Sequence, residues 1–342
     1  MMTHRYTECG LLRRFCVAFA LLCLLGAHLP VRAQEKENSE FKLAIGLFND
    51  GMYDLAAEQL KNFISAYPAT SQGIEARFIL GQTQLKLKRY DDARITFQNF
   101  ALAYVEHPKA PEAWLRVGEA FLGGKNEHEA ASAYERVKVF HPKSPLVPEA
   151  LLKAGELYRR IGDRENAKRM FRTVIQDYSS SPSVLSARLS ASQLFAEEGQ
   201  TELAEREARR VSESDAPAEV KSAALFSLGK LDVMSSRFAE AEATFSTLIV
   251  SYAKSPAAVA ATYDLGLLDL SARAFPAAVE RFKRVSSAEN ADDTLKALSM
   301  MMTGEAYLRQ HEYGSAEKAF EKLLSFSPAA VLRQASEFGH FL

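Results

Sequence analysis

The chain has 342 residues, which is enough for two ordinary domains or for one elongated repeat array. Hydrophobic residues make up 47% and charged residues 25%, a composition that excludes a polytopic membrane protein and a wholly disordered chain. The formal net charge of −1 excludes a global basic field of the kind that attracts nucleic acids.

Residues 1–33 have the pattern of a secretory signal peptide. Basic residues near the start precede a short apolar run at 15–25. Val31 and Ala33 then provide small residues at the −3 and −1 positions of a cleavage site after Ala33. The apolar run is too short to span a bilayer comfortably, and an uncleaved N-terminal anchor is the alternative.

All three cysteines lie in this segment, at positions 9, 16 and 23. Neither Cys16 nor Cys23 follows a small residue, which argues against a lipoprotein signal. Cleavage would leave a mature chain without disulfides, thiolate nucleophiles or cysteine metal ligands. That chain would begin at Gln34 and hold 38 basic and 42 acidic residues. We therefore expect a mildly acidic exported protein.

A repeat with a period of 37 residues follows a short polar lead-in at 34–40. A small residue marks each repeat, and we call its place the small position: Ala44, Gly81, Gly118, Gly155, Ser192, Gly229, Gly266, Gly304 and Gly339. An alanine follows it by twelve residues in the first eight repeats: Ala56, Ala93, Ala130, Ala167, Ala204, Ala241, Ala278 and Ala316. Four residues further stands a large apolar side chain in all but the fifth repeat, which has Ala208: Leu60, Phe97, Tyr134, Phe171, Phe245, Phe282 and Phe320.

This register predicts two antiparallel helices, A and B, in each repeat. The small position lets helix B approach helix A closely, and the alanine does the same from the other side. The large apolar side chain lies one turn further along helix B. We expect it to fill the gap between one helix pair and the next.

Local signals indicate where these helices begin and end. Glycine seven residues after the small position favours the left-handed conformation that ends helix A, and it occurs at Gly51, Gly162 and Gly199. Residues typical of a first helical turn follow three positions later: Asp54, Asp91, Glu165, Glu202 and Pro276. Pro111 and Pro148 are placed to open helix A in two repeats.

The pattern resembles the tetratricopeptide repeat (TPR) family. Its marks are clearest in two repeats, as Trp114, Gly118, Phe121, Ala130, Tyr134 and Pro142, and as Gly304, Tyr307, Ala316, Phe320 and Pro328. The resemblance implies an all-α, right-handed solenoid of about eight helix-turn-helix repeats with a partial ninth. Residues 63–68 and 75–81 look like the subclass found in bacterial envelopes. That subclass includes the periplasmic coordinator of the Tol-Pal system and the TPR lipoprotein of the barrel-assembly machine.

The repeats group into 41–184, a weak fifth repeat at 185–221, and 222–331. The fifth repeat has Ser192 and Ala208 where the others have smaller and larger residues, and it is either a tolerated poor repeat or a hinge. Residues 332–342 begin a ninth repeat. They form either an apolar cap or the edge of a longer protein.

We find no sequence motif for catalysis or for cofactor binding. The glycines are isolated rather than clustered in a phosphate loop, and no serine has the setting of a nucleophile elbow. The mature histidines are scattered over different repeats and complete no zinc motif. We therefore expect a protein that is not an enzyme and that uses neither cofactor nor metal.

The resemblance implies that the A helices line a concave groove that binds partner segments. Charged and polar residues one and five positions after the small position have no evident structural role. We take these as candidate binding residues, with an ordinary solvated face as the alternative: Gln82, Lys86, Glu119, Glu156, Arg160, Gln193, Lys230, Glu305 and Arg309.

These observations predict an exported, non-enzymatic scaffold or adaptor in the periplasm or cell envelope. It would bind a protein or peptide, no nucleic acid, and would have no membrane span in its mature form. One alternative is that the chain is the TPR portion of a larger enzyme or envelope machine. Another is a self-associating array joined through its apolar end.

Overall fold

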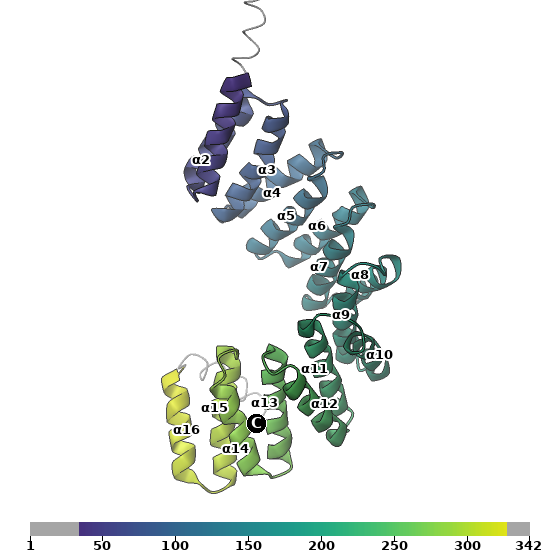
Figure 1. Ribbon diagram of the computed structural model, residues 1–342, viewed down its shortest axis with the longest axis vertical. Helices are drawn as coiled ribbons and strands as arrows, with labels where there is room; N and C mark the ends of the chain where they lie inside the picture. The colour runs from purple at the N-terminus through teal and green to yellow at the C-terminus, as the bar shows by residue number, and fades with distance from the viewer. Residues whose placement is uncertain (1–33, 327–342) are drawn as a thin grey trace, which may run out of the picture. The chain divides into compact units, whose positions relative to one another are not determined.

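The computed structural model describes residues 34–326, and Figure 1 shows them as a succession of helices joined by short turns. The signal peptide and the ninth repeat predicted from the sequence lie outside the described residues. No β-strand occurs between residues 34 and 326, so the predicted all-α repeat architecture is confirmed.

Each of the eight repeats contributes one helix A and one helix B. Residues 34–49 are helical and belong to helix A of the first repeat. The other A helices are α3 (Ser71–Lys86), α5 (Ala110–Gly123), α7 (Val147–Arg160), α9 (Ser183–Glu197), α11 (Ala218–Met234), α13 (Pro256–Ser271) and α15 (Asp293–Arg309). The B helices are α2 (Tyr53–Ala66), α4 (Tyr90–Ala103), α6 (Glu127–Phe140), α8 (Arg164–Asp177), α10 (Thr201–Ser212), α12 (Phe238–Ser251), α14 (Phe275–Ser286) and α16 (Tyr313–Phe326).

The lead-in predicted at 34–40 is itself helical and runs without a break into residues 41–49. Glu37 is buried within this stretch. The first repeat therefore begins earlier along the chain than the hydrophobic pattern indicated, because polar residues continue the helix N-terminally.

The described residues form two compact units, one ending at Ile161 and the other beginning at Gly162. This boundary falls between α7 and α8, inside the fourth repeat, and not in the fifth repeat. The two helices of the fifth repeat, α9 and α10, pack on each other and on α11. A hinge within the fifth repeat stays a prediction.

Helices A and B meet closely at the small position, as the register predicts. A Cβ atom built on Gly81 would lie 2.7 Å from the ring of Phe97, and one on Gly229 would lie 2.4 Å from the ring of Phe245. Both distances are shorter than van der Waals contact, so only glycine admits the ring. The large side chain thus occupies a recess in helix A of its own repeat. It also packs against the next helix pair, as expected, because Phe245 shares a buried cluster with Ala261 and Leu265 of α13, and Phe282 shares one with Ala306 of α15.

The fifth repeat replaces this glycine–ring contact with a different one. The hydroxyl of Ser192 donates a hydrogen bond of 2.8 Å to the carbonyl of Ala204, and both residues are fully buried. Ala208, also fully buried, stands where other repeats have the ring. The serine and the alanine occur together because the Ser192 side chain on helix A occupies space that a ring at position 208 would need.

The turn after each helix A has one residue with a left-handed backbone, always seven positions after the small position. Three are the predicted glycines, Gly51 (φ 76°), Gly162 (φ 83°) and Gly199 (φ 72°). The other five are Lys88, Lys125, Ser236, Arg273 and His311, with φ between 57° and 63°. The turn is therefore common to all eight repeats, whether or not its residue is glycine.

Candidate partner-binding site

The candidate residues one position after the small position lie on the A helices among buried neighbours. Glu156 is exposed although Gly155 and Leu157 beside it are buried, and Lys230 is exposed between buried Gly229 and Leu231. A helix turns about 100° per residue, so these two side chains reach solvent while the adjacent positions pack inward. The other candidates at this position are half-buried: Gln82, Glu119, Gln193 and Glu305.

In the first unit the candidates fall on three successive A helices. Gln82 and Lys86 lie one turn apart on α3, and no hydrogen bond or ion pair joins either side chain to another residue of the described range. Glu119 on α5 forms an ion pair of 2.8 Å with Arg116 of the same helix. Arg160 on α7 forms one of 2.9 Å with Glu127 at the start of α6.

In the second unit the candidates fall on α9, α11 and α15. The side chain of Gln193 makes no hydrogen bond within residues 34–326. The Lys230 ammonium lies 3.5 Å from the carboxylate of Asp264, and Arg309 pairs with Glu305 at 2.7 Å one turn away. The candidates thus divide into residues with a local ion-pair partner and residues that keep their full hydrogen-bonding capacity for a ligand.

Asp264 belongs to this site and was missed by the sequence analysis. It lies on α13 two residues before Gly266 and is only 8% exposed. Burial raises the pKa of its carboxyl group, and Lys230 opposes that shift. Lys230 and Asp264 are 34 positions apart and belong to successive repeats, so the pattern within one repeat does not bring them together. The only signal in the sequence was that Lys230, in the preceding repeat, would need a partner of opposite charge.

The described part of the chain holds no group of three or more His, Cys, Asp or Glu side chains arranged to bind a metal ion. No helix within it is long and apolar enough to cross a membrane. The candidate residues on the A helices offer ion pairing and hydrogen bonding through Gln, Glu, Lys and Arg side chains.

Family models of the tetratricopeptide repeat match residues 41–100, 97–145, 149–181, 226–293 and 263–331. The chain belongs to the tetratricopeptide repeat family. The matched segments cover repeats in both units, and the glycine–ring contacts and left-handed turns described above are the physical basis of this TPR pattern. No curated protein matches the chain.

Several solved TPR structures share the fold. A tetratricopeptide repeat protein from Parabacteroides merdae is 18% identical with a TM-score of 0.52, covering 78% of this chain and 98% of its own. PilF from Pseudomonas aeruginosa is 15% identical with a TM-score of 0.50, covering 68% and 98%. PilW, a type IV pilus biogenesis factor, is 16% identical with a TM-score of 0.52, covering 65% and 96%. At these identities the likeness concerns the fold alone.

Proposed function

We propose that this TPR protein is a non-enzymatic scaffold, exported to the periplasm or cell envelope, that binds a segment of a partner protein along its A helices. The observation that carries the proposal is the solvent-facing line of polar and charged residues on successive A helices. TPR repeats generally mediate protein–protein interaction, and within each unit the stacked A helices present their own part of this line to a ligand.

The residues without local partners define where binding would be strongest. A side chain already held in an ion pair must lose that pair or share it when a ligand arrives, whereas Gln82, Lys86 and Gln193 need not. A partner segment with hydrogen-bonding side chains or a free carboxylate would match these three residues. Each unit presents its own part of this surface.

Site-specific crosslinking tests the binding surface. A photo-crosslinking amino acid is placed at Gln82 or Gln193 in the mature chain, and at Glu58 on α2 as the control, because Glu58 is exposed on a B helix. We expect the same crosslinked partner from positions 82 and 193 in envelope extract and none from position 58. Equal crosslinking from all three positions would contradict the assignment.

Charge reversal gives a second, independent test. The variant Glu119→Lys, Glu156→Lys, Arg160→Glu should weaken partner capture without loss of helicity, because exposed charges change stability by less than about 0.5 kcal/mol. The matched control is Glu58→Lys, Glu129→Lys, Lys61→Glu, which makes the same change in net charge on exposed residues of α2 and α6. Capture that is lost equally in both variants would indicate a nonspecific charge effect.

The export part of the proposal rests on the N-terminal sequence. Expression of the full chain in a Gram-negative host, followed by fractionation and mass spectrometry, should find a periplasmic product that begins at Gln34. An uncleaved product that stays with the membrane would favour the N-terminal anchor instead, and a cytoplasmic product would contradict export.

A further inference from the structure

A hollow of about 380 Å³ lies in the second unit between α8, α9 and α10, on the side of helix A that faces away from the candidate residues. Ala191 and Phe195 of α9 line it, and each is two residues from Gln193. Two residues turn a helix by about 200°, so the hollow and Gln193 lie on nearly opposite faces of α9. It is therefore separate from the binding surface proposed above.

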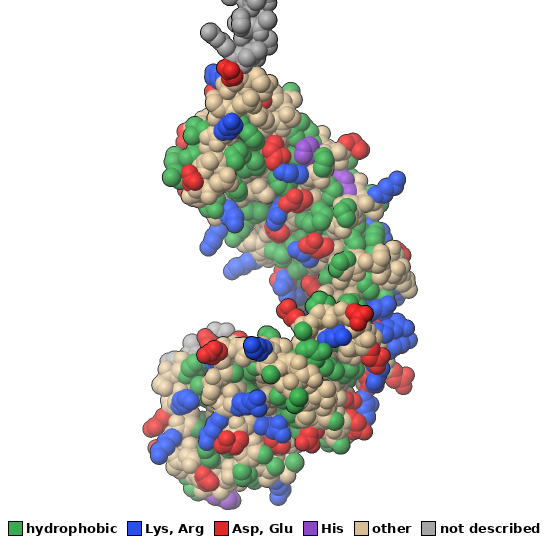
Figure 2. Space-filling model, viewed as in Figure 1, with side chains coloured by type: hydrophobic (Ala, Val, Ile, Leu, Met, Phe, Trp, Pro, Cys, Tyr) green, Lys and Arg blue, Asp and Glu red, His purple; other side chains and the backbone are tan. Residues whose placement is uncertain are grey.

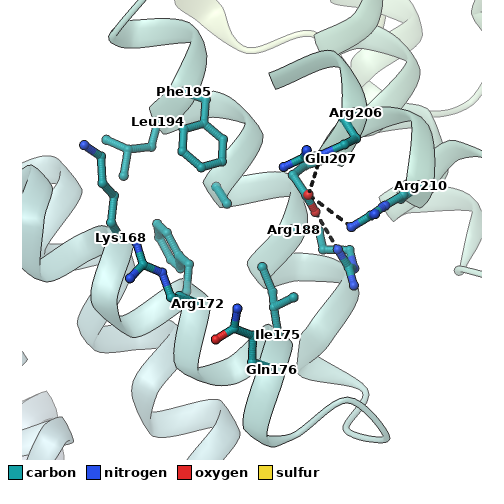
Figure 3. Close-up of a pocket in the computed structure, with 12 residues that line it drawn as sticks. Lys168, Arg172, Ile175, Gln176, Arg188, Leu194, Phe195, Arg206, Glu207 and Arg210 are labelled. Carbon is teal, nitrogen blue, oxygen red and sulfur yellow. Dashed lines mark hydrogen bonds and ion pairs between the residues drawn. The ribbon is translucent and has the colours of Figure 1, made fainter. Parts of the chain in front are cut away.

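The hollow has an apolar floor between two cationic edges. Phe171 and Ile175 of α8 and Leu194 and Phe195 of α9 provide apolar walls. Figure 3 shows Lys168 and Arg172 on the α8 side, and Arg188, Arg206 and Arg210 gathered on the other. In Figure 2, Lys and Arg side chains with acids among them cluster over α8–α10.

One buried carboxylate organises the second edge. Glu207 is 8% exposed and pairs with Arg188 at 2.5 Å, Arg210 at 3.3 Å and Arg206 at 3.5 Å (Figure 3). One negative charge faces three positive charges, so the edge keeps a positive excess while its side chains are held in place. Such an edge is preorganised to receive a further anionic group.

The first edge contributes one cation without a partner. Lys168 is neutralised by Glu165 and Glu198, at 3.1 and 2.9 Å. Arg172 is exposed, and within residues 34–326 its guanidinium has neither an ion-pair nor a hydrogen-bond partner. Arg172 is thus the free cation of the hollow.

A second hollow of about 260 Å³ lies three repeats later, between α14, α15 and α16. Its cations are Lys283, Lys318 and Lys322, and its aromatic wall is Tyr307. The Lys283 ammonium lies 5.4 Å from the Tyr307 ring centroid and 3.8 Å from Glu280. Lys318 and Lys322 are exposed, and neither ammonium group has an ion-pair or hydrogen-bond partner in the described part of the chain.

The two hollows occupy the same place in the repeat. Each hollow lies between two successive repeats. Arg172 and Lys283 belong to the earlier repeat, and each stands 17 residues after its small position. The cations of the later repeat match in the same way, 14 and 18 residues after its small position: Arg206 with Lys318, and Arg210 with Lys322. Phe195 and Tyr307 correspond too, each three residues after the small position.

This triad of cations is confined to these two junctions. At each of the other five junctions between repeats, the three equivalent positions hold only one cation. In the order of Arg172, Arg206 and Arg210, these positions are Lys61, Ile95 and Asn99; Gln98, Ser132 and Arg136; Glu135, Arg169 and Thr173; Arg209, Ala243 and Thr247; and Ser246, Glu280 and Arg284. The two sites are therefore isolated from each other by junctions of different charge.

We propose that the two hollows are a pair of equivalent binding sites for acidic peptide segments, each accepting a carboxylate between its cations and a neighbouring apolar side chain against its aromatic wall. Charge complementarity and the apolar floor specify this chemistry. The sites form a second interaction surface that does not depend on the one along the A helices.

The geometry favours a peptide over other anionic partners. An anionic membrane surface would need a continuous cationic face, whereas the junctions between the two hollows lack the cation triad. A nucleic acid would need a basic domain, and the whole chain carries a net charge of −1. A concave apolar floor fits one or two side chains of a peptide.

Titration calorimetry on the mature chain tests the proposal. The probe is a short peptide with Asp and Glu around a Leu-Phe pair, at low ionic strength because salt screens exposed charges. We expect two peptides per chain for the wild type. Arg172→Glu should weaken binding at one site by at least about tenfold, and Lys318→Glu with Lys322→Glu should do the same at the other. All three changes together should weaken binding at both sites.

Three controls keep the test specific. The variant Lys42→Glu, Lys61→Glu, Arg164→Glu makes the same charge change at exposed residues outside both hollows, and should bind within about twofold of the wild type. Reversal of Glu119, Glu156 and Arg160 should leave peptide binding unchanged. Peptides with Asn and Gln for the acids, or Ser-Ser for Leu-Phe, should bind more weakly.

Each contrary outcome has a definite meaning. Equal loss in the pocket and control variants, or binding unaffected by the pocket substitutions, would overturn the proposal. Stronger retention by vesicles of equal parts phosphatidylcholine and phosphatidylglycerol than by the peptide would replace it with a membrane surface. Circular dichroism on every variant confirms that binding, rather than folding, has changed.

Discussion

The ring of Tyr134 lies so close to Gly118 that a Cβ atom at position 118 would be 2.3 Å from its Cε1 atom. The two residues are 16 positions apart, on helices A and B of one repeat. The same contact recurs at Gly266 with Phe282 and at Gly304 with Phe320. This contact sets how closely the two helices of a TPR repeat approach each other in this protein.

Gly118→Ala should therefore destabilise the protein. The added methyl group must displace a fully buried ring, and such overpacking costs about 1–3 kcal/mol. Thermal and urea unfolding followed by circular dichroism measure the change. Gly46→Ala is the matched control, because nothing lies within 4 Å of its Cβ position. In a helix interior that change should stabilise slightly, by about 0.5–1 kcal/mol. Equal effects at the two glycines would contradict the packing argument.

The fifth repeat offers a test of coupling between the small position and the ring. Ala208→Phe alone should destabilise, because the ring would meet the Ser192 side chain. Adding Ser192→Gly should recover part of the loss, with an interaction energy of about 0.5–3 kcal/mol in a double-mutant cycle. Additive effects of the two substitutions would show that the space around Ala208 has another origin.

The five non-glycine residues with a left-handed backbone are sites for stabilisation. Ser236→Gly and Arg273→Gly should each raise the unfolding midpoint, because the left-handed conformation costs about 1–2 kcal/mol for a residue with a Cβ atom. Gly162→Ala should lower the midpoint for the same reason, since Gly162 has a φ of 83°. A midpoint that falls in both Gly variants would indicate that these side chains contribute contacts that outweigh the strain.

Asp264 should make stability depend on pH. Burial raises the pKa of its carboxyl group above the ordinary value of 3.8, so the folded chain holds its proton to higher pH than the unfolded chain does. The resulting stabilisation is complete below pH 3.8 and is lost as the pH rises through the raised pKa of the folded state.

Asp264→Asn removes this dependence. The variant should gain stability relative to the wild type as the pH rises from about 4, and the difference should level off once the wild-type carboxyl is ionised. Urea unfolding at a series of pH values measures it. Lys230→Gln is the control, because loss of the opposing charge should enlarge the pH dependence. A constant difference between Asp264→Asn and the wild type at all pH values would contradict the argument.

Much of this fold could be predicted from the sequence because its causes are local. The buried alanines Ala56 to Ala316, the left-handed glycines and the first-turn prolines Pro111 and Pro148 all stand where the 37-residue register places them. Each depends on the face of one helix or on one turn, and a regular helical period reports that directly. The fifth repeat follows the same register: Ser192 stands at the small position and hydrogen-bonds to Ala204, and the buried Ala208 stands where the other repeats have a large side chain.

The sequence by itself thus determined the eight repeats, their helix pairs and the residues between the helices of each pair. Only the tertiary structure decided which candidate residues pair with another helix, that Asp264 is buried beside Lys230, and that Arg172 lies across a hollow from Arg206 and Arg210. Such relationships join helices of different repeats. Periodicity along one helix shows which face is buried, but the side chains that meet between two repeats depend on how those repeats are offset and rotated when they pack.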